Sequence, residues 1–149
     1  MDMKVKYYFL LMLLGMITLQ SCDNDDDRIP LPDKVSAYIQ KTYPQANIEE
    51  VDALPGGGVE VDIWDGAIKK ELKFDAKSEW LSTSWDIQPA ALPNAVTEAV
   101  KTSAIYNTYY IDDADYYETP AGHYYLLELE RAGAPDTYVK IDAEGNFLK

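Results

Sequence analysis

The sequence predicts an α+β fold in which helices pack on one face of a continuous antiparallel sheet. One observation is a repeated helix start, because LPDKV at 31–35 recurs as LPNAV at 92–96. Another is a repeated ending, because residues 72–81 align without gaps to residues 139–148. Stretches of alternating apolar and polar residues lie between these motifs, as in strands. We therefore expect a tandem repeat of one helix and an antiparallel four-stranded unit, with copies over about 31–88 and 89–149.

Each repeated LP motif predicts the start of a short amphipathic helix. Proline suits a helix N-terminus, and Asp33 or Asn94 beside it can cap the helix or occupy its first turn. The first helix should end at Tyr43, because the residue before a proline disfavours helical geometry. Apolar and small residues then follow at helical spacing: Val35, Tyr38, Ile39 and Tyr43 in the first helix, and Val96, Ala99, Val100 and Ser103 in the second.

Alternation with a period of two predicts strands at 59–64 and 123–130. Glycine- and proline-containing turns at 56–58 and 119–122 would close the hairpins. The repeated ending predicts a tight Asp-Ala turn and a last strand in each copy. Trp80 and Phe147 occupy equivalent positions there, so both are expected in the core.

The face of the sheet away from the helices is expected to carry aromatic and aliphatic side chains among acidic groups. Four residues are candidates for this face: Trp64, Tyr124, Leu126 and Tyr138. Aromatic anchors ringed by polar residues are typical of a protein-binding surface. Cross-strand pairing that only stabilises the sheet is the alternative explanation.

Tyr109 and Tyr110 are further candidates for protein binding, within the tyrosine- and aspartate-rich connection of the second copy. A solvated loop of this composition could contact a protein or a glycan. It could equally be a loop and a strand with one buried row of side chains.

Residues 1–21 predict a lipoprotein signal peptide, with Lys4 and Lys6 before an apolar stretch at 7–19. This stretch is shorter than the roughly 18–20 residues that span a bilayer. Its Leu-Gln-Ser-Cys ending resembles the lipobox of bacterial lipoproteins, so Cys22 is expected to be acylated and to anchor the protein in a membrane. An ordinary cleaved signal with an incidental cysteine is the alternative.

Residues 22–30 are expected to form an acidic tether before a domain at 31–149. The tether resembles the acidic export signal of Gram-negative surface lipoproteins, although a plain solvated tether explains it equally well. Its carboxylates are Asp23, Asp25, Asp26 and Asp27. The predicted location is the cell envelope of a Gram-negative bacterium, as an outer-membrane lipoprotein that is exposed at the surface or faces the periplasm.

Charge and composition exclude several classes of function. The 149 residues include 26 Asp and Glu against 13 Lys and Arg, a net charge of −13, which argues against nucleic acid as a partner. The only histidine, His123, lies in a predicted turn and the only cysteine is assigned to the lipid, so no nucleophile has a base in reach. Residues 112–115 lack the spacing of a calcium loop. We expect no enzyme, no cofactor and no metal site.

Three motifs resemble those of the PepSY-like lipoproteins described as β-lactamase-inhibitor-like. They are the LPxxV helix start at 31–35, Tyr-Pro-x-Ala at 43–46 and Phe-Asp-x-x-x-x-Trp at 74–80. The resemblance covers nearly all of 31–149 and implies that the partner is an enzyme such as a protease or a β-lactamase, held by steric blocking. The predicted function is a non-catalytic, lipid-anchored envelope module that binds an unidentified protein through its open sheet face.

An accessory lipoprotein that binds a surface glycan or a small ligand is the alternative function. Trp64, Trp85 and the tyrosine cluster would then supply the stacking platforms.

Overall fold

The computed structural model of the chain describes residues 29–149. The predicted signal peptide, Cys22 and the tether aspartates Asp23, Asp25, Asp26 and Asp27 lie outside the described residues, so their roles stay predictions. Among residues 29–149, no helix is both long enough and apolar enough to cross a membrane.

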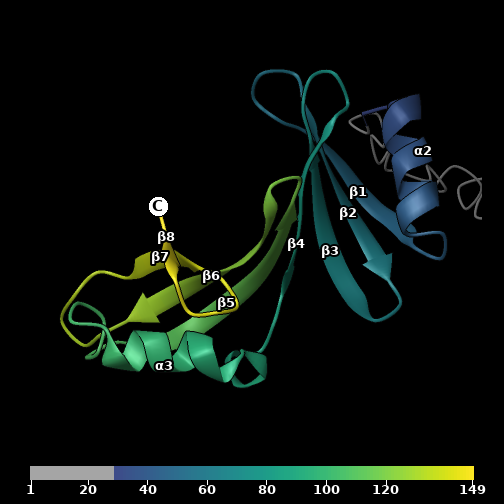
Figure 1. Cartoon of the computed structure of the whole chain (residues 1–149). Helices are drawn as coiled ribbons and strands as arrows, with labels where there is room; N and C mark the ends of the chain where they lie inside the picture. The colour runs from purple at the N-terminus through teal and green to yellow at the C-terminus, as the bar shows by residue number, and fades with distance from the viewer. Residues whose placement is uncertain (1–28) are drawn as a thin grey trace, which may run out of the picture.

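Over residues 29–149 the chain forms two α-helices and one sheet of eight strands, which confirms the predicted α+β class (Figure 1). In chain order the elements are α2 (Asp33–Thr42), β1 (Asn47–Ala53), β2 (Val59–Asp65), β3 (Ile68–Phe74), β4 (Trp80–Asp86), the 3-10 helix η2 (Pro89–Ala91), α3 (Asn94–Thr102), β5 (Tyr110–Thr119), β6 (Gly122–Glu130), β7 (Thr137–Ile141) and β8 (Phe147–Leu148). The strands lie in the sheet in this same order, and every neighbouring pair is antiparallel.

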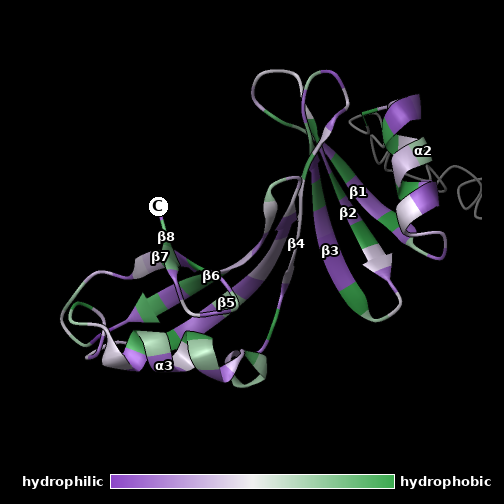
Figure 2. Cartoon of the chain, in the orientation of Figure 1, coloured by the Kyte–Doolittle hydropathy of each residue, from purple (hydrophilic) through white to green (hydrophobic). Residues whose placement is uncertain are grey.

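Both helices begin directly after the proline of their LP motif. Pro32 and Pro93 are the N-cap residues, so Asp33 and Asn94 occupy the first turn and neither makes a capping hydrogen bond. α2 ends before Tyr43, as the following proline predicts. In Figure 2 each helix alternates between hydrophilic and hydrophobic segments, the pattern of an element that buries one face.

The buried side chains form two separate clusters, and each contains one helix. The first unites Val35 and Ile39 of α2 with apolar residues of β2 and β3. The second unites Val96 and Val100 of α3 with apolar residues of β5, β6 and β7. The buried strand residues are Val59, Val61, Ile63, Leu72 and Phe74 in the first cluster, and Ala114, Leu127, Leu129, Val139 and Ile141 in the second.

The strand register places these buried residues on one face of the sheet. Val61 pairs with Leu72, Leu72 with Thr83, and Thr83 with Glu118 on β5. Ala114, four residues before Glu118, pairs with Leu127, and Leu127 pairs with Val139. Because directly paired residues point to the same side, this "core face" is continuous from β1 to β7. The opposite side is called the open face below.

The Asp-Ala turns that follow β3 and β7 have the same hydrogen-bond geometry. The carboxylate of Asp75 accepts hydrogen bonds from the backbone N–H groups of Lys77 and Glu79, at 2.8 Å each. The carboxylate of Asp142 accepts them from Glu144 at 3.1 Å and Asn146 at 2.8 Å. Hydrogen bonds favour the charged carboxylate: the backbone bonds hold the pKa of Asp75 below the usual value, and a bond from the Asn146 side chain, followed by the backbone bonds, does the same for Asp142.

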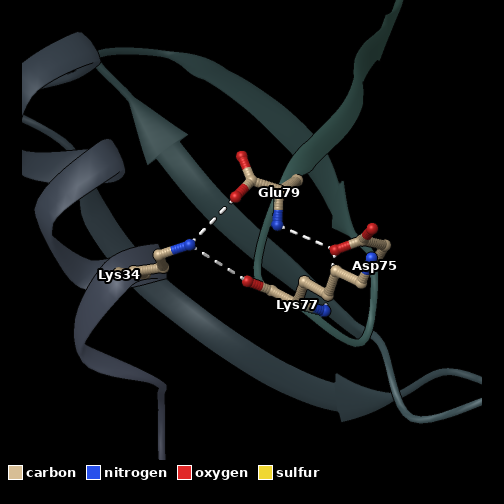
Figure 3. A network of polar contacts seen from close by, with 4 residues as sticks. All are labelled: Lys34, Asp75, Lys77 and Glu79. Carbon is tan, nitrogen blue, oxygen red and sulfur yellow. Dashed lines mark hydrogen bonds and ion pairs between the residues drawn. The ribbon is translucent and has the colours of Figure 1, made fainter.

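Each turn contacts the start of its own helix at an equivalent helical position. At the turn after β3, Lys34 of α2 donates hydrogen bonds to the carbonyl of Lys77 and to the carboxylate of Glu79 (Figure 3). At the turn after β7, the backbone of Gly145 lies so close to α3 that a Cβ there would be 2.6 Å from the carbonyl oxygen of Ala95. Ala95 corresponds to Lys34 in the LP alignment.

The two aromatic residues expected in the core differ from each other. Trp80 is partly buried against the first cluster, where its ring stacks on Tyr38 at 5.7 Å. Phe147 is 39% exposed, so the prediction of a core position was wrong. β8 has only two residues and pairs with β7 alone, and the Phe147 ring covers Tyr106 from the edge of the sheet.

Candidate functional site

The open face carries most of the candidate residues predicted from the sequence. Trp64 on β2, Leu126 on β6 and Tyr138 on β7 each adjoin a buried core-face residue, and Tyr124 lies two residues before Leu126 on the same side of β6. Tyr110 at the start of β5 also lies on this face, since it pairs with Glu130. The face is therefore mixed, with aromatic side chains set among charged ones.

Aromatic and aliphatic side chains gather on the half of the open face formed by β5–β8. Tyr117 pairs with Tyr124, and their rings stack with centroids 5.0 Å apart and an interplanar angle of 4°. Leu126 follows Tyr124 on β6, and Tyr138, 62% exposed, lies one strand further on. Together with Leu148 of β8, these residues form what we call the tyrosine patch: Tyr117, Tyr124, Leu126, Tyr138 and Leu148.

Hydroxyl groups at the margin of the patch are held by carboxylates. Tyr138 donates a hydrogen bond of 2.8 Å to Glu128, and Tyr110 donates one to Glu130. These bonds favour the neutral phenols: the bond to Glu130 raises the pKa of Tyr110 to about 12, and that to Glu128 raises the pKa of Tyr138. The tyrosine rings are thereby oriented while their apolar surface stays accessible.

Trp64 does not lie beside the tyrosine patch. Four strand spacings, about 19 Å along the sheet, separate β2 from β6. Trp64 pairs with Lys69, whose ammonium binds Glu49 at 2.8 Å and Asp62 at 2.9 Å. Both carboxylates raise the pKa of Lys69. The structure thus places Trp64 on the same face as the other candidates but in a separate, charged neighbourhood.

A shallow depression lies in the middle of the open face, where the two halves of the sheet meet. Its volume is about 360 Å³, and Asp86 of β4 and Asp115 of β5 line it as direct cross-strand partners. Burial, followed by the hydrogen bond with Asp86, raises the pKa of Asp115 to about 6. The remaining lining residues are Asp62, Lys69, Glu71, Ser84, Trp85 and Tyr117.

Carboxylates also gather at two places that resemble cation sites. The oxygens of Glu60, Asp62 and Glu71 lie within 4.8 Å of one another. Lys73 pairs with Glu60 and Glu71 there. The second group is Glu128, Glu130 and Asp136. Lysines pair with all three carboxylates of the first group, and tyrosine hydroxyls donate to Glu128 and Glu130 of the second.

Tyr109 and Tyr110 are neighbours in the sequence but lie on different sides of the sheet. Counting back by twos from Tyr117 would place Tyr109 on the open face. A bulge between Ile111 and Asp113 inserts one residue, so Tyr110 takes that side. Tyr109 packs against the second core cluster beneath Arg131, whose guanidinium lies 4.6 Å from the ring centroid.

Two other residues weighed from the sequence are placed away from the tyrosine patch. Trp85 is partly buried on the core face, with its ring 4.7 Å from Tyr116 and 4.8 Å from the ammonium of Lys70. His123 begins the exposed end of β6, where its ring lies 5.7 Å from Tyr116.

Sequence reasoning counted Tyr117 only within the tyrosine-rich connection and missed its position on the open face, and it missed the Asp86–Asp115 pair. Tyr117 follows Asp113 and Asp115 at a spacing of two, a strand signal that the bulge at Ile111 obscures. The aspartate pair depends on the register between β4 and β5, which lie on either side of α3 in the chain.

The antiparallel sheet with one mixed, helix-free face defines a class of small α+β domain, and the sequence comparison supplies the family. The family described as "Putative beta-lactamase-inhibitor-like, PepSY-like" matches residues 25–55 and 57–149. The chain belongs to this family, which confirms the resemblance seen in the three motifs. The family description names an inhibitor-like protein and no catalytic activity.

Solved structures share the fold. A BLIP-like protein from Bacteroides fragilis is 25% identical, with a TM-score of 0.70 over 85% of this chain and 89% of that chain. A DUF2874 family protein from Bacteroides ovatus is 18% identical, with a TM-score of 0.70 over 81% and 86%. A third, named "putative periplasmic proteins" and from Bacteroides eggerthii, is 17% identical, with a TM-score of 0.67 over 81% and 88%. The comparison with curated proteins finds no match.

Proposed function

We propose that this chain is a non-catalytic binding module of the cell envelope that holds another protein against its open face. The observation that carries the proposal is the tyrosine patch, in which the exposed Tyr138 and Leu148 and the half-buried Tyr117, Tyr124 and Leu126 share one half of a charged face. Exposed aromatic groups in a polar surround are the usual anchors of protein interfaces.

Sheet stabilisation alone accounts for only part of this patch. The stack of Tyr117 on Tyr124 is an ordinary cross-strand pair. Tyr138 has Glu128 rather than an aromatic residue as its partner and remains 62% exposed, and Leu148 is 42% exposed opposite Lys140. These two side chains gain little from the sheet, so a binding role explains their exposure better.

The family supports an inhibitor-like mode of action. The family is described as β-lactamase-inhibitor-like, and the Bacteroides fragilis relative is named a BLIP-like protein. An eight-stranded face can block an enzyme sterically without any catalytic group of its own. The partner in this proposal is therefore an envelope enzyme, such as a protease or a β-lactamase.

We also propose that the fold is a tandem repeat, with α2 and α3 packed on the same face of the sheet. The support is the equivalence of the two Asp-Ala turns and of their contacts with Lys34 and Ala95. Each copy has its own apolar cluster around one helix. Both helices on the core face would leave the open face free for a partner.

The proposed location is the outer membrane of a Gram-negative bacterium, through a lipid on Cys22. The basic residues, apolar stretch and terminal cysteine of residues 1–22 support the anchor. The name of the Bacteroides eggerthii protein supports an envelope location. The tether aspartates would separate the domain from the membrane or serve in export to the surface.

Affinity capture from the source cells tests the binding role. The full chain should retain a protein that the Tyr124→Ala/Tyr138→Ala variant loses, with an unchanged circular dichroism spectrum. Ile105→Ala is the matched control, because Ile105 is 70% exposed in the turn after α3. Equal retention by all three proteins would refute the role of the tyrosine patch. Retention of a polysaccharide instead would favour the glycan-binding alternative.

A further inference from the structure

The open face is strongly and unevenly acidic. Of the lysines in residues 29–149, three lie on it by register: Lys69 and Lys73 on β3, and Lys140 on β7. The carboxylates on the same face are Glu50, Asp52, Glu60, Asp62, Glu71, Asp86, Asp113, Asp115, Glu128 and Glu130. Because carboxylates outnumber lysines on this face, a partner that binds it needs a surface of complementary, positive charge.

The lysines neutralise only one half of the face. Lys69 binds Glu49 and Asp62, and Lys73 binds Glu60 and Glu71, so the positive charges are used on β1–β3. Lys140 lies over the ring of Tyr124 at 5.2 Å. Within residues 29–149, no lysine or arginine forms an ion pair with the carboxylates of β4–β6 that face the same side.

The carboxylates without lysine partners adjoin the tyrosine patch. Asp115 pairs directly with Leu126, and Asp113 pairs with Glu128, which in turn binds the hydroxyl of Tyr138. Asp86 and Asp115 line the central depression, and Tyr117 lines the same depression. Apolar and anionic groups thus form one surface on β4–β7 rather than two separate ones.

From this arrangement we infer that the partner of the open face is a basic protein surface, which places Lys or Arg side chains against the β4–β6 carboxylates and an apolar side chain against the tyrosine patch. The inference rests on the proposed function, and it adds the chemistry of the partner. A Lys or Arg side chain of the partner can form ion pairs with the carboxylates and can also pack on the adjoining tyrosine rings, since cations bind aromatic faces.

Charge and size exclude other occupants of the face. A second copy of this chain would bring two acidic faces together, which like charges disfavour. A neutral glycan would stack on the rings but leave the carboxylates without partners. Seven strand spacings by strands of seven residues give a face of about 34 Å by about 23 Å. That area, about 800 Å², equals one side of a standard protein interface.

Selection from a phage library of disulfide-constrained random peptides on the immobilised full chain tests the inference. We expect selected peptides that carry Lys or Arg together with an apolar residue. Their affinity should fall about tenfold or more on Asp86→Asn/Asp115→Asn, which keeps side-chain shape. It should also fall on Tyr124→Ala. Glu98→Gln/Glu144→Gln changes the net charge equally, on α3 and the β7–β8 turn, and should lower affinity less than about twofold.

Three outcomes would overturn the inference. They are no binder to the open face, binders without cationic residues, and cationic binders that lose affinity equally in both carboxylate variants. Exchanging Lys or Arg for Glu in a selected peptide repeats the test without altering the protein. Neutral binders that still require Tyr124 would leave the binding role standing and reject only the basic partner. The capture experiment in source cells fails or succeeds independently of the selection.

Discussion

Tyr117 and Tyr124 stack in parallel across β5 and β6, with ring centroids 5.0 Å apart, on the side of the sheet opposite the apolar core. The pair fixes two rings that neighbour Leu126 and stand beside carboxylates of the central strands. Rings ordered in advance lose little entropy when a partner binds. This ordered, half-buried pair of rings, next to the exposed Tyr138, is the basis of the proposed binding role.

The close approach of Gly145 to α3 predicts a specific steric requirement. A Cβ at Gly145 would lie 2.6 Å from the carbonyl oxygen of Ala95, and the residue has a φ of 88°. Gly145→Ala should lower the free energy of unfolding by about 3 kcal/mol, from strain and overlap together. Gly133→Ala is the control, because Gly133 has a φ of 76° in open space and should cost about 1 kcal/mol. If urea denaturation showed equal losses of unfolding free energy for Gly145→Ala and Gly133→Ala, the close contact between Gly145 and α3 would be contradicted.

Equivalence of the two turns predicts matched responses to mutation. Asp75→Ala and Asp142→Ala each remove the acceptor of two backbone N–H groups. Both variants should therefore lower the thermal midpoint, and by similar amounts. A large effect in one copy with none in the other would refute a tandem repeat at the turns. Glu144→Gln, which keeps the turn's hydrogen bonds, is the control.

The Asp86–Asp115 pair predicts how stability depends on pH. The pKa of Asp115 is about 6 in the folded protein against a usual value of 3.8, so the folded state binds the proton more tightly. Protonation of Asp115 therefore stabilises the folded state. This stabilisation is fully present below about pH 4 and is lost as the pH rises through about 6. Asp115→Asn should therefore raise the free energy of unfolding at pH 7.5 by about 1 kcal/mol, a value reduced for the partial exposure of the group.

Chemical denaturation at pH 4 and at pH 7.5 measures this effect. The difference between Asp115→Asn and the unaltered protein should vanish at the lower pH, where both side chains are neutral. A constant difference at the two values would show that the carboxyl pair does not titrate as described.

The proposed lipid anchor predicts where a cysteine variant is found. Cys22→Ala removes the only thiol in the chain, so no acyl chain can be attached. The variant should move from the membrane pellet to the soluble envelope fraction, because anchoring depends on the buried acyl CH₂ groups. Membrane association of Cys22→Ala at the level of the unaltered protein would refute lipidation. Ser21→Ala, which keeps the thiol, is the control.

Much of the fold follows from local patterns in the sequence. The LP motifs fix both helix starts because proline fits the N-terminus and not the interior of a helix. The alternation at 59–64 fixes the two faces of β2, so Trp64 is found on the open face as predicted. These features depend on residues close in the chain, which is why they can be predicted.

The arrangement of the candidate site depends on relations between distant strands. The bulge between Ile111 and Asp113 decides that Tyr110, and not Tyr109, reaches the open face. The distance between Trp64 and Tyr124 depends on strand order. Phe147 was expected in the core from its alignment with Trp80, but its edge strand has no further neighbour to cover it. Such features follow from register and sheet edges rather than from local periodicity.

The account's central claim is that the open face, and no other surface of the domain, contacts a protein partner. The most direct measurement is site-specific photo-crosslinking in the source cells, with p-benzoylphenylalanine at Leu126 in the tyrosine patch or at the exposed Ala104 after α3. We predict a discrete crosslinked protein from position 126 and none from position 104. A crosslink from Ala104 with none from Leu126, or none from either position, would contradict the claim.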